Sequence, residues 1–186
     1  EVGPYLESRG LFPSYLHRAG VGYLSSEDVP KFLELVERVG GVETAKEVGL
    51  ITPSGHMLTG GIFFPVYDQD GSIQTFSIRL LPSAELVQKG ASPHWTLKIP
   101  PFYPLGCMYP RSGMDLLKGR ATFICEGAID TITLLQNGYN AIGLLGVSNW
   151  KPHFLEFVGT KETIIAFDRD ENRSGQKAAV KLAAKI

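Results

Sequence analysis

The sequence has little cysteine and histidine, and neither residue is clustered. Its 186 residues include two cysteines, Cys107 and Cys125, which do not have CxxC spacing, and four scattered histidines. A structural zinc site needs several such ligands at short, regular spacings, so the sequence contains no recognisable zinc site. Cys125 stands in a short apolar segment, where we expect an unreactive thiol buried in a core strand.

Long apolar runs are also absent. No stretch approaches the roughly 20 apolar residues of a membrane-spanning helix, and no signal peptide is evident. We therefore expect a cytoplasmic protein without membrane contact. The chain begins with Glu1 rather than Met and ends within an expected helix, so we expect a fragment excised from a longer protein.

Neither sign of charge dominates the sequence. Lysine and arginine total 18, aspartate and glutamate total 19, and the formal net charge is −1. A protein without a global basic field can bind nucleic acid only through a local basic face. A chain of this length can bury a sizeable core, as one large domain or two small ones.

In the first part of the chain, apolar spacing predicts helices followed by a β-hairpin. The helices are expected at 13–18, from an N-cap at Ser26 to Gly40, and at 42–48. The hairpin is expected to pair strands 62–67 and 72–81 around a turn at Asp70-Gly71. In its second strand Arg79 lies on the face opposite Phe76 and Ile78. Residues 82–110 are rich in glycine and proline and predict loops and short strand, with a domain boundary near Gly106.

The second part alternates strand and helix. The expected strands are 121–125, 140–144 and 163–167, and the expected helices are 129–137, 152–158 and 175–186. This alternation is typical of an α/β fold with a parallel sheet, in which ligands bind outside the carboxyl ends of the strands.

Acidic residues follow two of these strands directly. Glu126 follows the first strand, Asp168 and Asp170 follow the third, and Asp130 lies one helical turn after Glu126. Carboxylates held together repel one another unless a cation neutralises them, and Mg²⁺ or Mn²⁺ is the natural partner. Simpler roles exist: Glu126 and Asp130 could be helix-terminal acids favoured by the helix dipole, and the aspartate pair a solvated strand end with an Asx turn.

These acidic segments resemble the motifs of the Toprim domain. The segment Phe123-Ile-Cys-Glu-Gly-Ala-Ile-Asp130 is similar to its first motif. Ala166-Phe-Asp-Arg-Asp170, with Gly175-Gln-Lys-Ala-Ala179, is similar to its DxD motif and the helix after it. Toprim domains occur in bacterial DnaG-type primases, in type IA and type II topoisomerases and in several nucleases.

Upstream segments resemble those that set the DnaG-type primases apart. They are Tyr5-Leu-Glu-Ser-Arg-Gly-Leu11, Ala19-Gly-Val-Gly-Tyr23, Ile62-Phe-Phe-Pro-Val-Tyr-Asp68 with Gly71 and Phe76-Ser-Ile-Arg79, and Tyr103-Pro-Leu-Gly106. In this order they resemble the start of the RNA-polymerase region, a helix-to-turn element, a phosphate-facing β-hairpin and the link into the Toprim part. The resemblance covers nearly the whole chain.

The resemblance implies two domains and one function. Residues 1–106 would form an α+β subdomain that holds template and nucleotide. Residues 107–186 would form a parallel-sheet Toprim domain, incomplete at its C-terminal end. The implied function is that of a DNA primase core, which makes short RNA primers from ribonucleoside triphosphates on a single-stranded DNA template. Its source would be a bacterium, a phage or a mobile element, with a replicative helicase contacted through regions outside this sequence.

The resemblance also implies roles for the acidic residues. Glu126 would act as the general acid or base of a nucleotidyl transfer. The ligands of Mg²⁺ or Mn²⁺ would be Asp168 and Asp170, with Glu126 and Asp130.

Six residues are candidates for binding nucleic acid or nucleotide: Arg79, Lys98, His94, Trp95, Arg173 and Lys177. Arg79 resembles an arginine of the primase basic groove, although an ordinary surface arginine is an equal alternative. Lys98 or His94 could supply a cation and Trp95 a stacking platform for a base, whereas a structural, buried Trp95 is the simpler interpretation. Arg173 and Lys177 could steer phosphates, or Lys177 could belong to a solvated helix face.

The sequence departs from the family pattern at several positions. Ala128 stands where a tyrosine is common, Arg169 replaces the glycine between the two aspartates, and residues 171–174 are additional. The chain also ends before a further Toprim strand that would carry more acidic ligands. Two alternatives therefore stay open: a non-catalytic Toprim module that binds nucleic acid, and a Toprim nuclease or topoisomerase. Whether the fragment is active alone also stays open.

Overall fold

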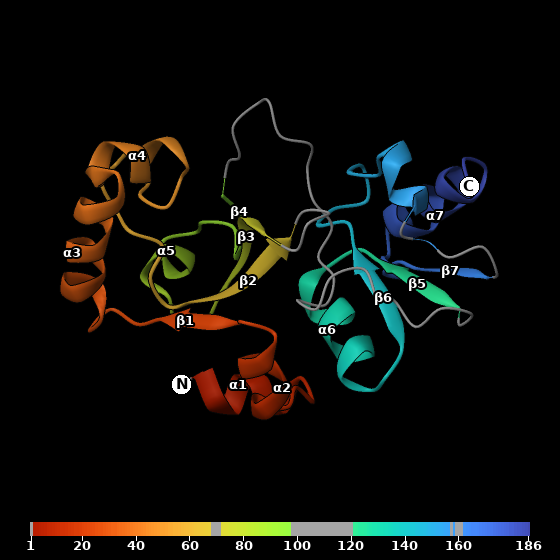
Figure 1. Cartoon of the computed structure of the whole chain (residues 1–186), viewed down its shortest axis with the longest axis horizontal. Helices are drawn as coiled ribbons and strands as arrows, with labels where there is room; N and C mark the ends of the chain where they lie inside the picture. Colours follow the sequence, from red (N-terminus) through yellow and green to blue (C-terminus); the bar gives the residue numbers. More distant parts are fainter. Residues whose placement is uncertain (1, 68–71, 98–120, 157, 159–161) are drawn as a thin grey trace.

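The computed structural model describes residues 2–67, 72–97, 121–156, 158 and 162–186. It contains an antiparallel sheet in the first part of the chain and a parallel sheet in the second (Figure 1). This arrangement confirms the expected α/β fold class, with an α+β first part followed by a parallel-sheet part. Within these residues, no helix has the length and apolar character needed to cross a bilayer.

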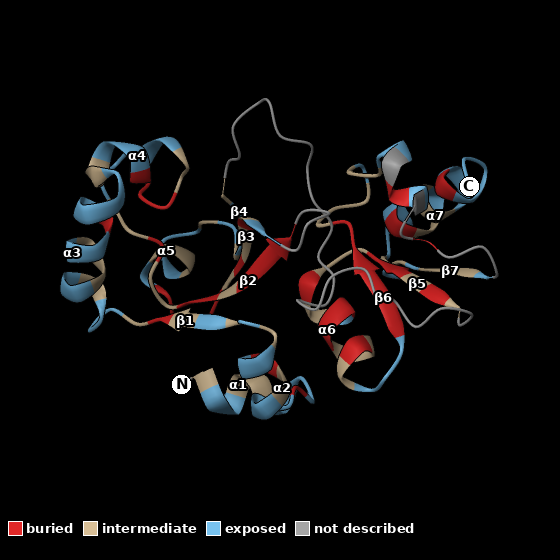
Figure 2. Cartoon of the chain, in the orientation of Figure 1, coloured by how far each residue is buried: buried red, intermediate tan, exposed pale blue. Residues whose placement is uncertain are grey.

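The antiparallel sheet has the order β1-β2-β3-β4. Its strands are β1 (Gly22–Leu24), β2 (Gly61–Tyr67), β3 (Ile73–Leu80) and β4 (His94–Thr96). The expected hairpin is its central pair, and β2 is buried along most of its length (Figure 2). Within β3, Ile78 is buried in the core, whereas the next residue, Arg79, pairs with Ile62 on one side and His94 on the other.

Short helices surround this sheet. They are α1 (Val2–Ser8), α2 (Pro13–Arg18), α3 (Val29–Val39), α4 (Gly41–Glu47) and α5 (Glu85–Gln88). The helices α3 and α4 pack on each other through a small core that includes Val36 and Ala45. The helices α1 and α2 lie below β1 and beside α6 in Figure 1, and both pack on the apolar cluster that β2 and α6 share.

The parallel sheet has the order β6-β5-β7. Its strands are β6 (Asn140–Gly143), β5 (Thr122–Cys125) and β7 (Thr163–Ala166), and the connecting elements are α6 (Ala128–Gln136), the 3-10 helix η1 (Pro152–Glu156) and α7 (Ser174–Ala183). In this sheet Cys125 pairs with both Gly143 and Ala166. The three strands therefore end at one level, and the residues that follow them share one edge of the sheet.

The helix α6 joins the two halves. Its buried residues Ala128 and Ile132 belong to one apolar cluster with Leu11, Leu16, Ile62, Phe64 and Leu81 from the first part of the chain. The side chain of Gln136 adds two hydrogen bonds: its Oε1 accepts from the backbone N–H of Phe12 at 2.9 Å, and its Nε2 donates to the carbonyl of Gly10 at 2.7 Å. The segment after α1 is therefore held against the start of the parallel-sheet half.

Three local expectations are wrong in whole or in part. The residue that precedes α3 is Asp28, not Ser26, because the Ser25 hydroxyl donates a hydrogen bond to the Asp28 carboxylate (2.6 Å) and Pro30 fits the first turn. The helix-to-turn element expected at 19–23 is present in its first half, where α2 ends with its C-cap Ala19 and the chain turns at Gly20, but its last two residues belong to β1, which pairs with β2. The helix expected at 152–158 is a shorter 3-10 helix. The turn at Asp70-Gly71 and the boundary near Gly106 lie outside the described residues, so the division into 1–106 and 107–186 stays a prediction.

Candidate active site

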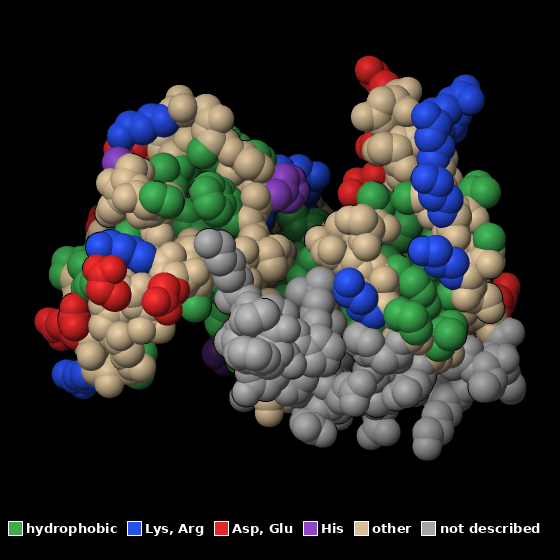
Figure 3. Space-filling view, turned by 90° about the horizontal axis from the view of Figure 1, so that it is seen from above, with side chains coloured by type: hydrophobic (Ala, Val, Ile, Leu, Met, Phe, Trp, Pro, Cys, Tyr) green, Lys and Arg blue, Asp and Glu red, His purple; other side chains and the backbone are tan. Residues whose placement is uncertain are grey.

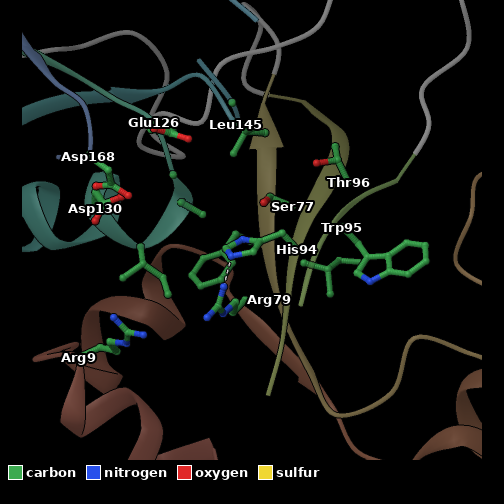
Figure 4. A pocket seen from close by; sticks show the side chains of 16 residues that line it. Arg9, Ser77, Arg79, His94, Trp95, Thr96, Glu126, Asp130, Leu145 and Asp168 are labelled. Atoms are coloured by element: carbon green, nitrogen blue, oxygen red, sulfur yellow. Dashed lines mark hydrogen bonds between the residues drawn. The ribbon is translucent and has the colours of Figure 1, made fainter. Parts of the chain in front are cut away.

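The carboxylates expected at the sheet edge do meet there. Glu126 follows β5 directly and Asp168 lies two residues beyond β7, so the parallel pairing of these strands brings both to one edge. Asp130, in the first turn of α6, joins them. All three line one cavity of about 610 Å³ between the two sheets (Figure 4).

Burial and mutual repulsion raise the pKa values of two of these acids. The pKa of Glu126 lies above its ordinary value, first because of burial and then because of the negative charges of Asp168, Asp170 and Asp130. Burial and the charge of Asp168 also raise the pKa of Asp130, opposed by backbone hydrogen bonds at Asp130 and Gly127 and by the positive charge of Arg9. Oε2 of Glu126 is buried and has no hydrogen-bond partner among the described residues. The charge of Arg9 and the backbone hydrogen bonds offset these effects only in part, since the pKa of Asp130 stays above its ordinary value.

Asp170 has a different environment from Asp168. Its Oδ2 accepts a hydrogen bond from the Ser174 hydroxyl and another from the backbone N–H of Gly175 at 3.2 Å, so it binds the first turn of α7. Gly175 lies so close to the chain that a Cβ at this position would be 2.1 Å from the carbonyl oxygen of Asp168. The start of α7 thus packs directly on the backbone that carries Asp168.

The acidic edge has the donor chemistry of a hard divalent cation, although its ligands are not closed into a cluster. Among the described residues, no three His, Cys, Asp or Glu side chains are close enough together to hold a metal ion. Carboxylate oxygens, the raised pKa values and an Oε2 of Glu126 without a partner among the described residues suit a hard divalent cation better than a soft metal. Glu126, Asp130 and Asp168 line the cavity, but they are not drawn together into one ligand group.

The opposite wall of the cavity is basic. Arg79 on β3 and His94 on β4 lie on this wall, and an amino group of the Arg79 guanidinium hydrogen bonds to Nε2 of His94 (Figure 4). Nε of Arg79 is buried and has no hydrogen-bond partner in the described structure. Burial, and then the charge of Arg79, lower the pKa of His94. The sheets therefore place an unsatisfied basic wall across from an unsatisfied acidic edge.

Sequence reasoning missed two residues of this cavity. Arg9, just after α1, lines it, and its charge acts on Asp130. Arg9 lies inside the segment 5–11. The resemblance of that segment to the start of the primase core was the sequence signal that could have identified Arg9. Leu145 also lines the cavity, and its backbone has a positive φ of 56°. Such a conformation is rare for leucine and is typical of strained backbone at functional sites.

The loop that contains Leu145 is tied to Glu126. The backbone N–H of Gly146 donates to the carbonyl of Glu126 at 3.1 Å, and that of Leu144 donates to the carbonyl of Cys125 at 3.1 Å. These bonds fix the backbone of Glu126 from the β6 side. Cys125 itself is buried, and burial raises the pKa of its thiol to about 12, in agreement with the expected unreactive core position.

The remaining candidate residues lie at or outside the cavity rim. Trp95 lines the cavity, but it also packs with the core around Ile78 and donates from Nε1 to the Ser92 carbonyl at 2.7 Å. Arg173 and Lys177 are exposed and do not line the cavity. Lys177 lies four residues before Lys181 on α7, and Figure 3 shows Lys and Arg side chains along that half of the molecule. Lys98 lies outside the described residues.

Comparisons with known proteins match both halves of the chain. Residues 123–186 match the family model described as Toprim-like. No curated protein matches the chain.

Solved structures match nearly the whole chain. A DnaG catalytic core is 19% identical with a TM-score of 0.69, over 97% of this chain and 58% of that chain. The Aquifex aeolicus primase (zinc-binding and RNA polymerase domains) is 18% identical with a TM-score of 0.71, over 97% of this chain and 45% of that chain. The RNA polymerase domain of Mycobacterium tuberculosis primase DnaG is 20% identical with a TM-score of 0.71, over 97% of this chain and 62% of that chain.

The chain spans between 45% and 62% of the length of these three structures. This chain therefore has a Toprim-like C-terminal part within the fold of the DnaG primase catalytic core.

Proposed function

We propose that the chain is the nucleotide-transferring core of a primase, joining ribonucleotides on a single-stranded DNA template with the help of a divalent cation. One observation carries this proposal: the cavity has three carboxylates on one edge, with Arg9 beside them, and Arg79 on the opposite wall, within a DnaG-type fold. A nucleoside triphosphate and its metal ion need this combination of charges.

The basic residues would bind the phosphates. Arg79 has a planar guanidinium with an unsatisfied buried Nε, which suits it to phosphate oxygens. Arg9 lines the same cavity near Asp130. Its positive charge can reduce the repulsion between the acids and a bound phosphate. A DnaG catalytic domain of similar fold, 20% identical, has been solved bound to single-stranded DNA. We propose the same class of template here, with Trp95, Lys98, Arg173 and Lys177 as further contacts.

Glu126 would accept the proton of the attacking 3′ hydroxyl. Its raised pKa makes it a better base than an ordinary carboxylate, and its buried Oε2 has no hydrogen-bond partner in the described part of the chain. A divalent cation bound by Glu126, Asp168 and Asp130 would neutralise the charge that develops on the transferred phosphate. Asp170 would support this site by holding the start of α7 beside Asp168.

A primer-synthesis assay tests this function. The purified chain is incubated with single-stranded DNA, ribonucleoside triphosphates and Mg²⁺ or Mn²⁺, and RNA products are resolved on a gel. We expect short RNA products that depend on DNA and metal and that disappear in Glu126→Gln and Asp168→Asn. The exposed Glu34→Gln on α3 is the matched control and should keep the activity.

One alternative makes a different forecast in the same assay. The described residues form no group of three metal ligands, which favours a Toprim module that binds nucleic acid without catalysis. Such a module would retard single-stranded DNA in a gel, incorporate no nucleotide under any metal, and bind DNA equally well after Glu126→Gln.

A further inference from the structure

We propose that His94 is a neutral positioning residue, which holds the Arg79 guanidinium on the cavity wall by accepting its hydrogen bond. The histidine was a candidate cation for phosphate binding on sequence grounds. The structure supports a different role for it. The proposal deepens the proposed function, because it concerns how the phosphate-binding wall is assembled and how protons affect it.

The direction of the hydrogen bond follows from chemistry. Arginine carries only donors, so Nε2 of His94 must be the acceptor of the bond from Arg79. A ring nitrogen that accepts carries no proton. The ring is therefore neutral, with its proton on Nδ1, and it cannot act as a phosphate-binding cation while the bond exists.

The backbone makes this contact a property of the fold. Arg79 and His94 are direct cross-strand partners in the β3–β4 register, and neighbouring pairs Ile78–Trp95 and Ser77–Thr96 fix that register. Side chains opposite each other on one face of an antiparallel pair lie within reach of each other. The mobile end of the arginine is thus held by a residue that the sheet itself places.

Burial and the charge of Arg79 oppose the protonation of His94. Burial lowers the pKa of His94 first, and the positive charge of Arg79, which contacts it from β3, lowers it further. Across the cavity lie Arg9 after α1, Glu126 and Asp130 at the start of α6, and Asp168 after β7. As the pH falls through this lowered pKa, the imidazolium can no longer accept, and it repels Arg79. Phosphate binding through Arg79 should then weaken, although His94 has gained a positive charge.

The first test is a direct titration of His94 by NMR, with no ligand present. In the parent chain the pKa of His94 should lie below 6.5, the ordinary value for histidine. In Arg79→Ala it should rise towards that value, because the positive charge beside the ring is gone. An unchanged pKa in Arg79→Ala would overturn the proposal.

The second test measures binding of inorganic triphosphate without metal, from pH 5.5 to 8. At pH 8, His94→Ala should bind roughly three- to tenfold more weakly, the net effect of one lost hydrogen bond. His94→Gln should recover most of this affinity, since its amide oxygen reaches the place of Nε2 and does not titrate. In the Arg79→Ala background, His94→Ala should have no further effect.

The pH profile separates positioning from direct phosphate binding. The ratio of parent to His94→Gln affinity cancels the ionisation of the triphosphate itself. This ratio should fall as the pH drops below 6.5, whereas a histidine that binds phosphate as a cation would make it rise. A rising ratio, or full affinity in His94→Ala, would contradict the proposal. If the parent chain binds no triphosphate at all, the proposed binding of nucleotide is wrong. The NMR titration then tests the hydrogen bond between Arg79 and His94 by itself.

Discussion

At the scale of single residues, Glu126 combines two properties that rarely improve stability. It is partly buried beside other acids, and one of its oxygens has no protein partner among the described residues. A carboxylate whose pKa is raised by folding is more costly to ionise in the folded state than in the unfolded chain. Such a residue is expected where a proton or a cation is handled.

Glu126→Gln should therefore stabilise the metal-free protein while it removes activity. Because the pKa of Glu126 is raised in the folded state, its ionisation destabilises the parent at neutral pH. This destabilisation disappears as the pH falls through the raised pKa towards 4.5, the ordinary value. The glutamine cannot ionise, so the variant should lose this pH dependence. Its melting temperature at pH 7.5 should exceed the parent's, while primer synthesis falls roughly 10²- to 10⁴-fold. Thermal melts between pH 4.5 and 8 measure the first effect. A melting temperature lowered as much as in a core variant would contradict this role.

Asp168 and Asp170 should differ in metal binding. Asp168 faces the cavity, whereas an oxygen of Asp170 is already bound to Ser174 and Gly175. Asp168→Ala should weaken Mn²⁺ binding at least about tenfold, and Asp170→Ala should weaken it less while lowering stability by about 1 kcal/mol, as for a lost helix cap. The paramagnetic effect of Mn²⁺ on water relaxation measures the affinities. Equal losses of Mn²⁺ affinity in both variants would show that Asp170 contributes to metal binding as much as Asp168 does.

At the scale of elements, the start of α7 determines where Asp168 lies. The loop after β7 turns into α7 through Arg173, whose φ is 58°, and the helix begins against the Asp168 backbone. Residues 171–174, which depart from the family pattern, form this turn. Asp170 binds the first turn of this helix through Ser174 and Gly175.

Gly175→Ala should be poorly tolerated, because the added Cβ would overlap the carbonyl oxygen of Asp168. We expect a loss of about 1–3 kcal/mol in the free energy of unfolding, as for an overpacked core, together with weaker Mn²⁺ binding. Gly3→Ala in α1 is the matched control, since a Cβ there meets open space and alanine favours helix. Chemical denaturation compares the two variants, and equal stability would show that the contact relaxes without effect.

At the scale of the whole molecule, the cavity needs both halves of the chain. Its lining comes from the end of α1, from β3 and β4, from the start of α6 and from the residue after β7. The apolar cluster under α6 and the two hydrogen bonds of Gln136 connect these halves. The basic wall and the acidic edge therefore keep their separation only while α6 stays docked.

Gln136→Ala should loosen the docking of the segment that carries Arg9. Two hydrogen bonds at a partly exposed site are worth about 1–2 kcal/mol in stability, and triphosphate affinity should fall with the placement of Arg9. Hydrogen exchange should increase at the amide of Phe12, which loses its acceptor. Gln88→Ala at the exposed end of α5 is the control and should change neither exchange nor affinity. Unchanged protection at Phe12 would mean that the apolar cluster alone holds the segment.

The sequence by itself determined the alternation of strand and helix after residue 121 and the positions of Glu126 and Asp168 directly beyond their strands. Such patterns are local, since they depend on side-chain periodicity and on residues that end strands. The central hairpin was predictable for the same reason. The N-cap at Ser26 was mispredicted because Ser25 and Asp28 contact each other. The end of the segment 19–23 pairs with β2 and is strand, and the helix expected at 152–158 is a shorter 3-10 helix.

Only the tertiary structure decided which residues face one another. The neutral acceptor role of His94 depends on its cross-strand register with Arg79, and the contribution of Arg9 depends on the docking of its segment on α6. The division of work between Asp168 and Asp170 depends on where α7 begins. Each of these is a contact between segments distant in sequence or a turn of special backbone geometry. The distances between such segments cannot be predicted from the local sequence pattern, because they are set by how the two sheets pack around α6.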